Sequence, residues 1–313
     1  MSHAKSLRAL LHGSELTKAA GAHNPLTAQL VERAGFDVVW ASGLEISASL
    51  GVPDANILSM NEVLAVARAM AEKVTIPVLA DCDSGFGGIG NVAHMIRSYE
   101  AAGIQGVCIE DKTFPKLNSF VSGNQALVPI EDFAGKIAAA VATRASEDFV
   151  VVARIEAFIS GFGLEEALRR AQAYELAGAD ALLIHSKQKT PDEIFSFCDA
   201  YDGALPIVVV PTTYNSVTME QLKAGGAALA IYANQGLRGA INSTLQVYKA
   251  ILAGGSAAAV EDQLAPLSEV FGLQGVAALL ATEDRFESIG KDIAKQVLEG
   301  GGEGRGKADV LGH

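Results

Sequence analysis

The chain reads IPVLADCD over residues 76–83 and GVCIED over residues 106–111. Each run is apolar until it ends in carboxylates, which is typical of a strand covered on both faces in a parallel sheet. Between the two runs, residues 92–102 carry apolar side chains at helical spacing. We therefore predict a strand–helix–strand unit whose acidic residues lie at the carboxyl ends of two neighbouring strands.

The same alternation runs along most of the chain. Apolar, β-branched runs predict strands, and each is followed by a stretch of helical periodicity. The predicted strands are residues 18–23, 38–42, 76–83, 106–111, 149–157, 181–186, 206–212 and 227–234. The predicted helices between them include residues 26–34, 60–73, 92–102, 130–144, 164–177 and 191–201. Several of these helices end in Gly, a common C-terminal cap before the next strand.

Eight such units predict an α/β fold, a (β/α)₈ barrel of the TIM type, with a doubly wound sheet as the alternative. A helix from residue 235 to about 254, and further helices over 260–280 and 285–298, exceed what a barrel needs. We expect residues 1–255 to form the catalytic barrel and residues 256–299 to pack on the barrel or on a partner subunit. Residues 300–313 are rich in Gly and charge, which predicts a disordered tail.

Composition excludes several classes of protein. The chain has 313 residues, of which 50% are hydrophobic and 19% charged, as in a well-buried globular protein. Its net charge is −12 and it has no basic block, which argues against a nucleic-acid partner. No apolar run approaches the ~20 residues of a membrane span. Three widely spaced cysteines and an N-terminus without an apolar signal core predict a cytoplasmic location.

Carboxylates gather where the predicted strands end. Asp81 and Asp83 are two residues apart and would lie on one face of their strand, and Glu110 and Asp111 end the next one. The carboxyl ends of barrel strands face the active site. Adjacent carboxylates repel each other unless a cation joins them, and oxygen ligands favour Mg²⁺ or Mn²⁺. We predict a divalent metal site, although any single acid could instead cap a helix or be solvated.

Two basic side chains lie within or at the end of predicted strands. Arg154 either pairs with Glu110 or Glu156, or binds a phosphoryl or carboxylate group of a substrate. A lone histidine such as His185 is more often structural, and its place at a strand end adds modest support for a functional role.

Two loops follow the acidic strand ends. The connection over residues 112–128 is long and carries Lys116, Asn118 and Ser119, which is typical of a lid at a barrel mouth. The sequence GFGGIG over residues 85–90 lacks a Walker pattern, so we predict a tight turn there rather than a phosphate-binding loop.

The chain resembles the phosphoenolpyruvate mutase and isocitrate lyase superfamily over most of its length. The resemblance is carried by WASGL at 40–44, PD at 53–54, DCDSGFG at 81–87 and IEDK at 109–112. The most specific feature is EDK at 110–112, followed after five residues by Asn118 and Ser119, which resembles the mutases. The phosphonopyruvate hydrolases resemble the mutases throughout but carry Thr at the position of Asn118. The Lys-Lys-Cys-Gly-His loop of the superfamily's carbon–carbon lyases does not occur in this sequence.

This resemblance implies an isomerase that interconverts phosphoenolpyruvate and phosphonopyruvate, a step of phosphonate biosynthesis. The alternatives are phosphonopyruvate hydrolysis to pyruvate and phosphate, and a hydrolase or lyase reaction on another 2-oxo acid. The resemblance also implies Mg²⁺ as cofactor, with Mn²⁺ able to replace it. It further implies a homodimer or homotetramer that exchanges a C-terminal helix between subunits, and metabolic coupling to an enzyme that consumes phosphonopyruvate.

The resemblance assigns expected roles position by position. Asp81 would bind the metal directly, and Asp83, Glu110 and Asp54 would hold its water ligands. The implied substrate-binding residues are Trp40, Ser42, Gly43, Leu44, Asn118, Ser119, Arg154 and His185. The implied catalytic residues are Asp54, Lys116, Asn118, Arg154 and His185, with Asp54 left open between a nucleophile and a partner of the metal.

Overall fold

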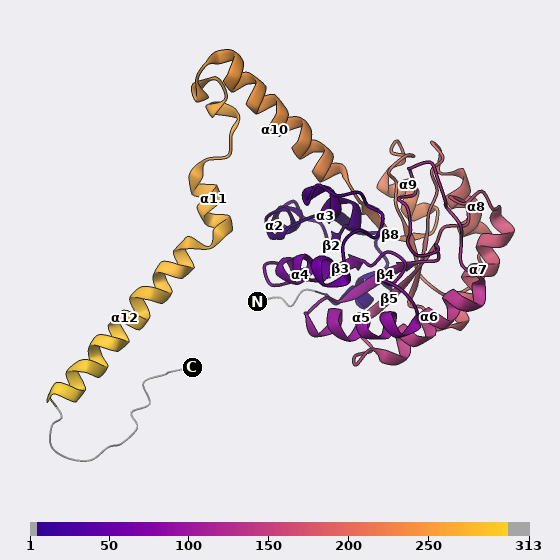
Figure 1. Ribbon diagram of the computed structural model, residues 1–313, viewed down its shortest axis with the longest axis horizontal. Helices are drawn as coiled ribbons and strands as arrows, with labels where there is room; N and C mark the ends of the chain where they lie inside the picture. The colour runs from indigo at the N-terminus through magenta and orange to yellow at the C-terminus, as the bar shows by residue number, and fades with distance from the viewer. Residues whose placement is uncertain (1–4, 300–313) are drawn as a thin grey trace. The chain divides into compact units, whose positions relative to one another are not determined.

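A closed barrel of eight parallel strands forms the centre of the fold (Figure 1). In this computed structural model, which describes residues 5–299, each strand pairs with the next and β8 pairs with β1. The strands are β1 Thr17–Ala22, β2 Val38–Ala41, β3 Val78–Asp81, β4 Gly106–Glu110, β5 Val150–Ile155, β6 Ala181–Ile184, β7 Ile207–Val209 and β8 Ala227–Tyr232. The predicted barrel is confirmed, and the closure of β8 on β1 excludes a doubly wound sheet.

Helices follow the strands and surround the barrel (Figure 1). They are α2 Pro25–Arg33, α3 Gly43–Ser49, α4 Met60–Ala71, α5 Ile89–Ala101, α6 Ile130–Thr143, α7 Leu164–Leu176, α8 Asp192–Ala200 and α9 Met219–Ala224. The helix α1 Leu7–Leu11 precedes β1, and α10 Gln235–Gly254 follows β8. The helices α2, α5 and α7 are followed by Gly35, Gly103 and Gly178, each at positive φ. Glycine adopts this conformation without the cost that a β-carbon brings, which explains the repeated Ala-Gly at these junctions.

The barrel has an inner and an outer core. The outer core packs the sheet against the surrounding helices, and the inner one fills the barrel with side chains such as Leu79, Leu183 and Ile231. Leu7 and Leu11 of α1 belong to the inner core, so this short helix plugs the barrel. A β-carbon at Gly106 would lie only 2.8 Å from Leu7 Cδ2, which explains glycine at the start of β4.

The chain beyond the barrel differs from the prediction. Residues 260–280 do not form one helix: two 3₁₀ turns, Ala257–Ala259 and Glu261–Gln263, come before α11 Leu267–Gln274. Pro266 precedes α11, and Gly275 ends it at φ 75°. The helix α12 Val276–Glu299 then runs without a break through the predicted gap after residue 280. Pro266 and Gly275 therefore set the ends of α11, although the apolar periodicity alone predicts a longer helix.

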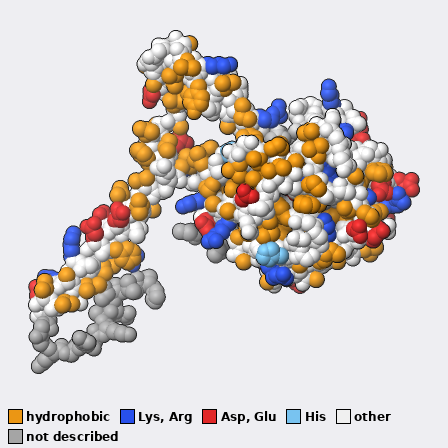
Figure 2. Space-filling model, viewed as in Figure 1, with side chains coloured by type: hydrophobic (Ala, Val, Ile, Leu, Met, Phe, Trp, Pro, Cys, Tyr) orange, Lys and Arg blue, Asp and Glu red, His pale blue; other side chains and the backbone are white. Residues whose placement is uncertain are grey.

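Contacts divide the chain into two units, one up to Leu245 and one from Gln246. The predicted boundary at residues 255 and 256 stays a prediction, and the predicted tail over 300–313 lies outside the described residues. In the second unit α11 contacts α12, and neither helix has a buried residue. Many hydrophobic side chains are exposed there (Figure 2), among them Leu252, Leu267, Phe271, Leu279, Phe286, Val297 and Leu298. No helix within residues 5–299 is long and apolar enough to cross a membrane.

Candidate active site

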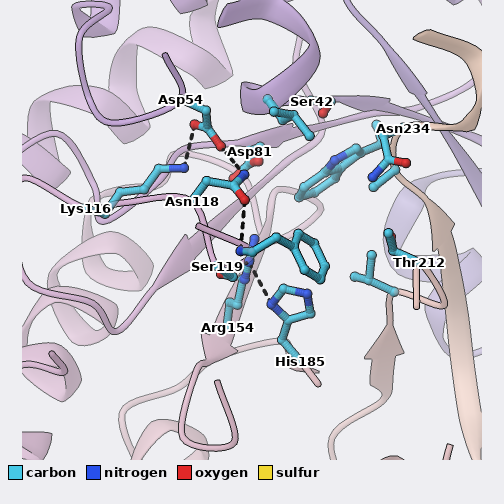
Figure 3. A pocket seen from close by; sticks show the side chains of 15 residues that line it. Ser42, Asp54, Asp81, Lys116, Asn118, Ser119, Arg154, His185, Thr212 and Asn234 are labelled. Carbon is cyan, nitrogen blue, oxygen red and sulfur yellow. Dashed lines mark hydrogen bonds and ion pairs between the residues drawn. The ribbon is translucent and has the colours of Figure 1, made fainter. Parts of the chain in front are cut away.

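A small cavity of about 50 Å³ lies at the carboxyl ends of the barrel strands (Figure 3). One enclosed water requires ~10–15 Å³, so this volume has room for a few water molecules. Most of the predicted site residues line it: Trp40, Ser42, Leu44, Asp54, Asp81, Lys116, Asn118, Ser119, Arg154 and His185. The remaining three, Gly43, Asp83 and Glu110, contact the lining side chains. The sequence therefore identified residues that the fold brings together.

The acidic residues reach the cavity by a different backbone path from the one predicted. Asp81 is the last residue of β3, but Asp83 has φ 49° and lies in the following turn, so the two carboxylates do not share one face of a strand. The turn continues through Phe86, at φ 56°, between two glycines at positive φ, which confirms the predicted tight turn. Glu110 ends β4 and lies 3.4 Å from Arg154 Nε through Oε2.

Burial raises the pKa values of the acids at the strand ends. It raises the pKa of Asp83 to about 7, helped by Asp81 and Asp54 and opposed by Lys116. Burial also raises the pKa values of Asp81 and Glu110, although Arg154 and Lys116 oppose it. The positive charges of Lys116 and Arg154 are therefore too few to offset the effect of burial on these three carboxylates.

The charge balance and the unpaired atoms fit a divalent cation. Five carboxylates and three cations are grouped here, which gives a formal charge of 3 − 5 = −2 when every acid is ionised. Asp54, Asp83, Glu110 and Glu156 form ion pairs with Lys112, Lys116 and Arg154, and Asp81 interacts electrostatically with Lys116 and Arg154. Glu110 Oε1 is buried without a hydrogen-bond partner. Among residues 5–299, no three His, Cys, Asp or Glu side chains are grouped as a metal-binding set. The unpaired Glu110 oxygen and the excess negative charge fit Mg²⁺, which binds through one or two carboxylates and keeps several waters.

The loop over residues 112–128 is fastened across the cavity by Asp54. Lys116 Nζ donates to Asp54 Oδ1 at 2.6 Å and lies 2.9 Å from Asp83 Oδ1. Asn118 Nδ2 donates to Asp54 Oδ2, also at 2.6 Å. Burial alone would raise the pKa of Asp54, but Lys116 and Asn118 hold it below its usual value. Both Asp54 oxygens thus accept hydrogen bonds from the loop, which we call the lid.

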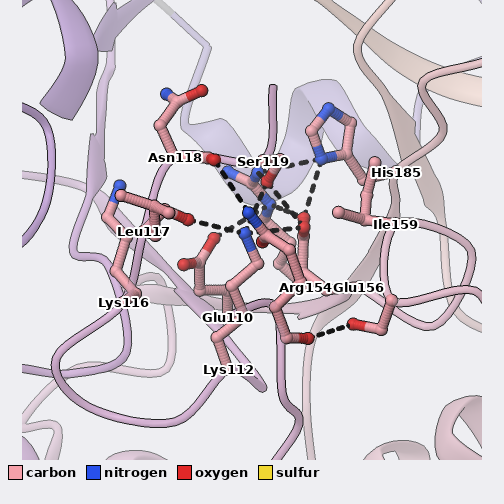
Figure 4. Close-up of polar contacts among 12 residues, drawn as sticks. Glu110, Lys112, Lys116, Leu117, Asn118, Ser119, Arg154, Glu156, Ile159 and His185 are labelled. Carbon is pink, nitrogen blue, oxygen red and sulfur yellow. Dashed lines mark hydrogen bonds and ion pairs between the residues drawn. The ribbon is translucent and has the colours of Figure 1, made fainter. Parts of the chain in front are cut away.

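The charged side chains of Lys112, Arg154 and Glu156 form a second network that contacts the lid (Figure 4). Lys112 Nζ donates to Leu117 O at 3.0 Å and to Ser119 Oγ at 2.7 Å, and lies 3.3 Å from Glu156 Oε2. Ser119 Oγ donates to Glu156 Oε2 at 2.7 Å. Arg154 Nε donates to Glu156 Oε1 at 2.5 Å. Burial would raise the pKa of Glu156, but Arg154 and His185 lower it well below its usual value, so this carboxylate stays charged.

The same network orients His185. Its Nδ1 lies 2.7 Å from Glu156 Oε1 and 2.9 Å from Arg154 Nη2. Burial lowers the pKa of His185, so the ring is neutral near pH 7. We place its single proton on Nδ1, facing the carboxylate, which leaves Nε2 as an acceptor. The Phe120 ring of the lid packs edge-on against His185 with the ring centroids 5.7 Å apart.

The opposite wall is formed by the end of β2 and the start of α3. Ser42 caps α3 by accepting a hydrogen bond from Glu45 N at 3.3 Å. Gly43 N donates to Asp81 Oδ2 at 3.2 Å. Trp40, in β2, is buried and lines the cavity with Leu44.

Several residues in or beside the site were not among the predicted ones. Asn56 Nδ2 donates to Asp83 Oδ2, and Glu156 joins the lid network. Phe120, Thr212 and Asn234 line the cavity. A signal existed for Glu156, a charge at the end of an apolar run. The others lie in loops, whose approach to the cavity depends on the closed barrel.

Comparison with known proteins identifies the family. The family model described as phosphoenolpyruvate phosphomutase matches residues 7–252. This chain belongs to that family. The phosphonopyruvate hydrolase of Variovorax sp. (strain Pal2) is 49% identical over 288 residues, which cover 91% of this chain and 99% of the hydrolase. The phosphoenolpyruvate phosphomutase of Tetrahymena pyriformis is 41% identical, with 90% of this chain and 94% of the mutase covered.

Solved structures show the same fold. The phosphoenolpyruvate phosphomutase of Streptomyces platensis subsp. rosaceus matches with a TM-score of 0.88 and 52% identity, covering 90% of this chain and 98% of that one. A phosphonopyruvate hydrolase solved with oxalate and Mg²⁺ matches with a TM-score of 0.86 and 48% identity, covering 91% and 99%. The chain is thus an enzyme of the phosphoenolpyruvate mutase and isocitrate lyase superfamily, in which both activities occur among similar proteins.

Proposed function

We propose that this protein is a Mg²⁺-dependent phosphoenolpyruvate mutase, an isomerase that moves a phosphoryl group between C3 and the enol oxygen of one pyruvate skeleton. The observation that carries this proposal is Asn118. Its side-chain amide joins the lid to Asp54 at 2.6 Å, at the position where the resemblance to the family implies Asn in mutases and Thr in hydrolases.

The acids at the strand ends would hold the metal. Asp81 would bind Mg²⁺ directly, and Asp83, Glu110 and Asp54 would hold its waters, in agreement with the uncompensated charge of this group. When bound, Mg²⁺ would polarise the keto oxygen of the pyruvyl part and so favour its enolate form. A 48% identical hydrolase structure that contains Mg²⁺ and oxalate supports Mg²⁺ as the metal.

The chain's own side chains would bind and orient the substrate. Trp40 would cover the pyruvyl part, and the backbone N–H groups of Gly43 and Leu44 would bind its carboxylate. Because Gly43 N is bonded to Asp81 here, this N–H would change partner when substrate binds.

Arg154, Asn118, Ser42, Ser119 and His185 would contact the phosphoryl group. When the carbon–phosphorus bond breaks, its electron pair stays with the pyruvyl part as the enolate. The phosphoryl group is then captured by the enolate oxygen of the same molecule, so the reaction needs no net proton transfer. Arg154 would spread the charge on the moving phosphoryl group, and the protein contributes mainly position and electrostatics.

Exclusion of water decides between isomerisation and hydrolysis. A water molecule that reaches phosphorus before the enolate oxygen yields pyruvate and phosphate. Phe120, Asn118 and Lys116 close one side of the cavity, and both Asp54 oxygens are bonded to the lid. These contacts also make Asp54 a weak nucleophile, because each oxygen already accepts a hydrogen bond. They favour a role for Asp54 in holding the lid and the metal's waters.

Phosphonopyruvate hydrolysis is the second candidate. It is favoured by the 49% identity to the Variovorax enzyme, which exceeds the 41% identity to the Tetrahymena mutase. A lyase reaction that uses a thiol is disfavoured: burial raises the pKa values of Cys82 and Cys108 well above the usual range and that of Cys198 to about 11.

Phosphorus NMR of the purified protein with phosphonopyruvate and Mg²⁺ tests the proposal. A mutase converts the signal to phosphoenolpyruvate, and a chelator stops the conversion. Inorganic phosphate as the first product would establish the hydrolase instead. No change in the presence of Mg²⁺ would contradict both activities and direct attention to other 2-oxo acids. Asp54→Ala with full turnover would contradict any catalytic role of that carboxylate.

A further inference from the structure

Asn56 lies between the acid cluster and the lid and contacts both. It belongs to the turn that connects α3 and α4 and has φ 56°, in the left-handed region. Asparagine tolerates this conformation better than most other residues with a side chain. The side-chain amide bonds to Asp83 and Lys116, which lie in two other loops.

The two ends of this amide hold two different parts of the site. Asn56 Nδ2 donates to Asp83 Oδ2 at 2.7 Å. Asn56 Oδ1 accepts from the backbone N–H of Lys116 at 2.6 Å. Lys116 itself reaches Asp54 and Asp83 through Nζ. One planar amide therefore connects a carboxylate of the acid cluster to the backbone of the lid at the residue that latches it.

We infer that Asn56 is a positioning residue that couples cation binding at the acid cluster to closure of the lid. The amide is rigid, so the place of Asp83 fixes where Oδ1 can receive the Lys116 N–H. With Mg²⁺ bound, Asp83 would be held in place by the metal's waters and would in turn hold Asn56. The Lys116 N–H would then meet a fixed acceptor when the lid closes. This inference rests on the Mg²⁺ site of the proposed function, but not on which product forms.

Asn56→Gly tests the coupling, because glycine keeps the left-handed turn and removes both hydrogen bonds. The readout is hydrogen exchange in peptides that contain the Lys116 amide, measured with and without Mg²⁺ alone. In the wild type we expect Mg²⁺ to slow this exchange about three- to tenfold, the range of one hydrogen bond. In Asn56→Gly the ratio should fall toward one, and Mg²⁺ affinity should weaken.

Two further variants make the result decisive. Asn56→Asp keeps the turn and the Oδ1 acceptor for Lys116, and it cannot donate to Asp83 when both carboxylates are ionised. Measured well above pH 7, the Mg²⁺-dependent slowing should therefore be lost here too. Asn124→Gly is the matched control. Asn124 lies in the lid, and its Oδ1 accepts from Ala126 N at 3.0 Å. No hydrogen bond or ion pair found within residues 5–299 links Asn124 to an acid. It should retain the wild-type ratio.

A wild-type ratio in either folded Asn56 variant would overturn the inference, as would a wild type whose Lys116 exchange does not respond to bound Mg²⁺. A wild-type protein that shows the coupling but does not convert phosphonopyruvate would instead overturn the proposed function and leave the role of Asn56 intact.

Discussion

Gly43 lies where a side chain would press on the aspartate that we propose as the direct metal ligand. A β-carbon there would lie 3.1 Å from Asp81 Oδ2, closer than ordinary van der Waals contact. Gly43→Ala should therefore displace the Asp81 carboxylate and weaken Mg²⁺ binding about tenfold, ~1.4 kcal/mol. Titration calorimetry with Mg²⁺ measures this change.

The matched control for this substitution is Gly90→Ala in α5, where a β-carbon would meet no atom within 4 Å. Because Gly90 is helical and its β-carbon would meet open space, Gly90→Ala should leave the melting temperature unchanged or raise it. Equal Mg²⁺ affinity in Gly43→Ala and Gly90→Ala would contradict direct metal binding by Asp81 in its present position.

Asn118 is the residue on which we expect the choice between isomerisation and hydrolysis to depend. Asn118→Thr removes the amide that donates to Asp54 Oδ2 and loosens one of the two lid contacts. Because water then reaches the phosphoryl group more often, the product should shift from phosphoenolpyruvate toward phosphate. Phosphorus NMR gives both amounts in one sample. Asn124→Thr, in the same loop, should keep the wild-type product ratio; an unchanged ratio in Asn118→Thr would remove the basis of the proposal.

At the scale of elements, α7 holds the far end of the lid through a buried ion pair. Arg170 Nη1 donates to Asp111 Oδ2 at 3.0 Å, and both terminal nitrogens reach Val128 O at 3.2 Å. Tyr174 OH donates to the same Asp111 oxygen at 2.8 Å. Burial raises the pKa of Asp111 to about 6 against the effect of Arg170.

Removal of Arg170 should therefore destabilise the protein in a pH-dependent way. Arg170→Met leaves a buried carboxylate without its cation, which costs roughly 3–5 kcal/mol. The pKa of Asp111 then rises further, so the folded state binds a proton more strongly than the unfolded state and stability falls as pH rises. Urea unfolding should show a smaller loss at pH 5 than at pH 8. Arg169→Met, which removes an exposed neighbour paired with Glu166, should cost under 1 kcal/mol at either pH; equal losses in the two variants would contradict this role.

The order of elements could be predicted from sequence because each strand is a short apolar run and each helix is periodic. The limits lay where local signals compete. Asp83 follows an apolar run that predicts a longer strand, yet the glycine-rich turn begins before it. Asn56 gives no signal of its own, because its partners Asp83 and Lys116 lie 27 and 60 residues away in sequence. Contacts of that kind depend on barrel closure, which periodicity does not encode.

At the scale of the whole molecule, the exposed apolar side chains of the second unit predict association of subunits. Phe271, Leu279 and Phe286 are each about half exposed, and none of the residues of α11 or α12 that the structure describes is buried. Exposed apolar surface of this extent is typical of an interaction site. We expect a homodimer or homotetramer, which light scattering after gel filtration measures.

Each such side chain buried at an interface stabilises it by about 1.5–3 kcal/mol, so Phe271→Glu with Leu279→Glu should shift the mass toward the monomer. Leu176→Glu, an equally apolar and highly exposed position on α7 of the barrel, should leave the mass unchanged; a monomeric wild type, or the same mass in all three proteins, would show that this surface does not join subunits.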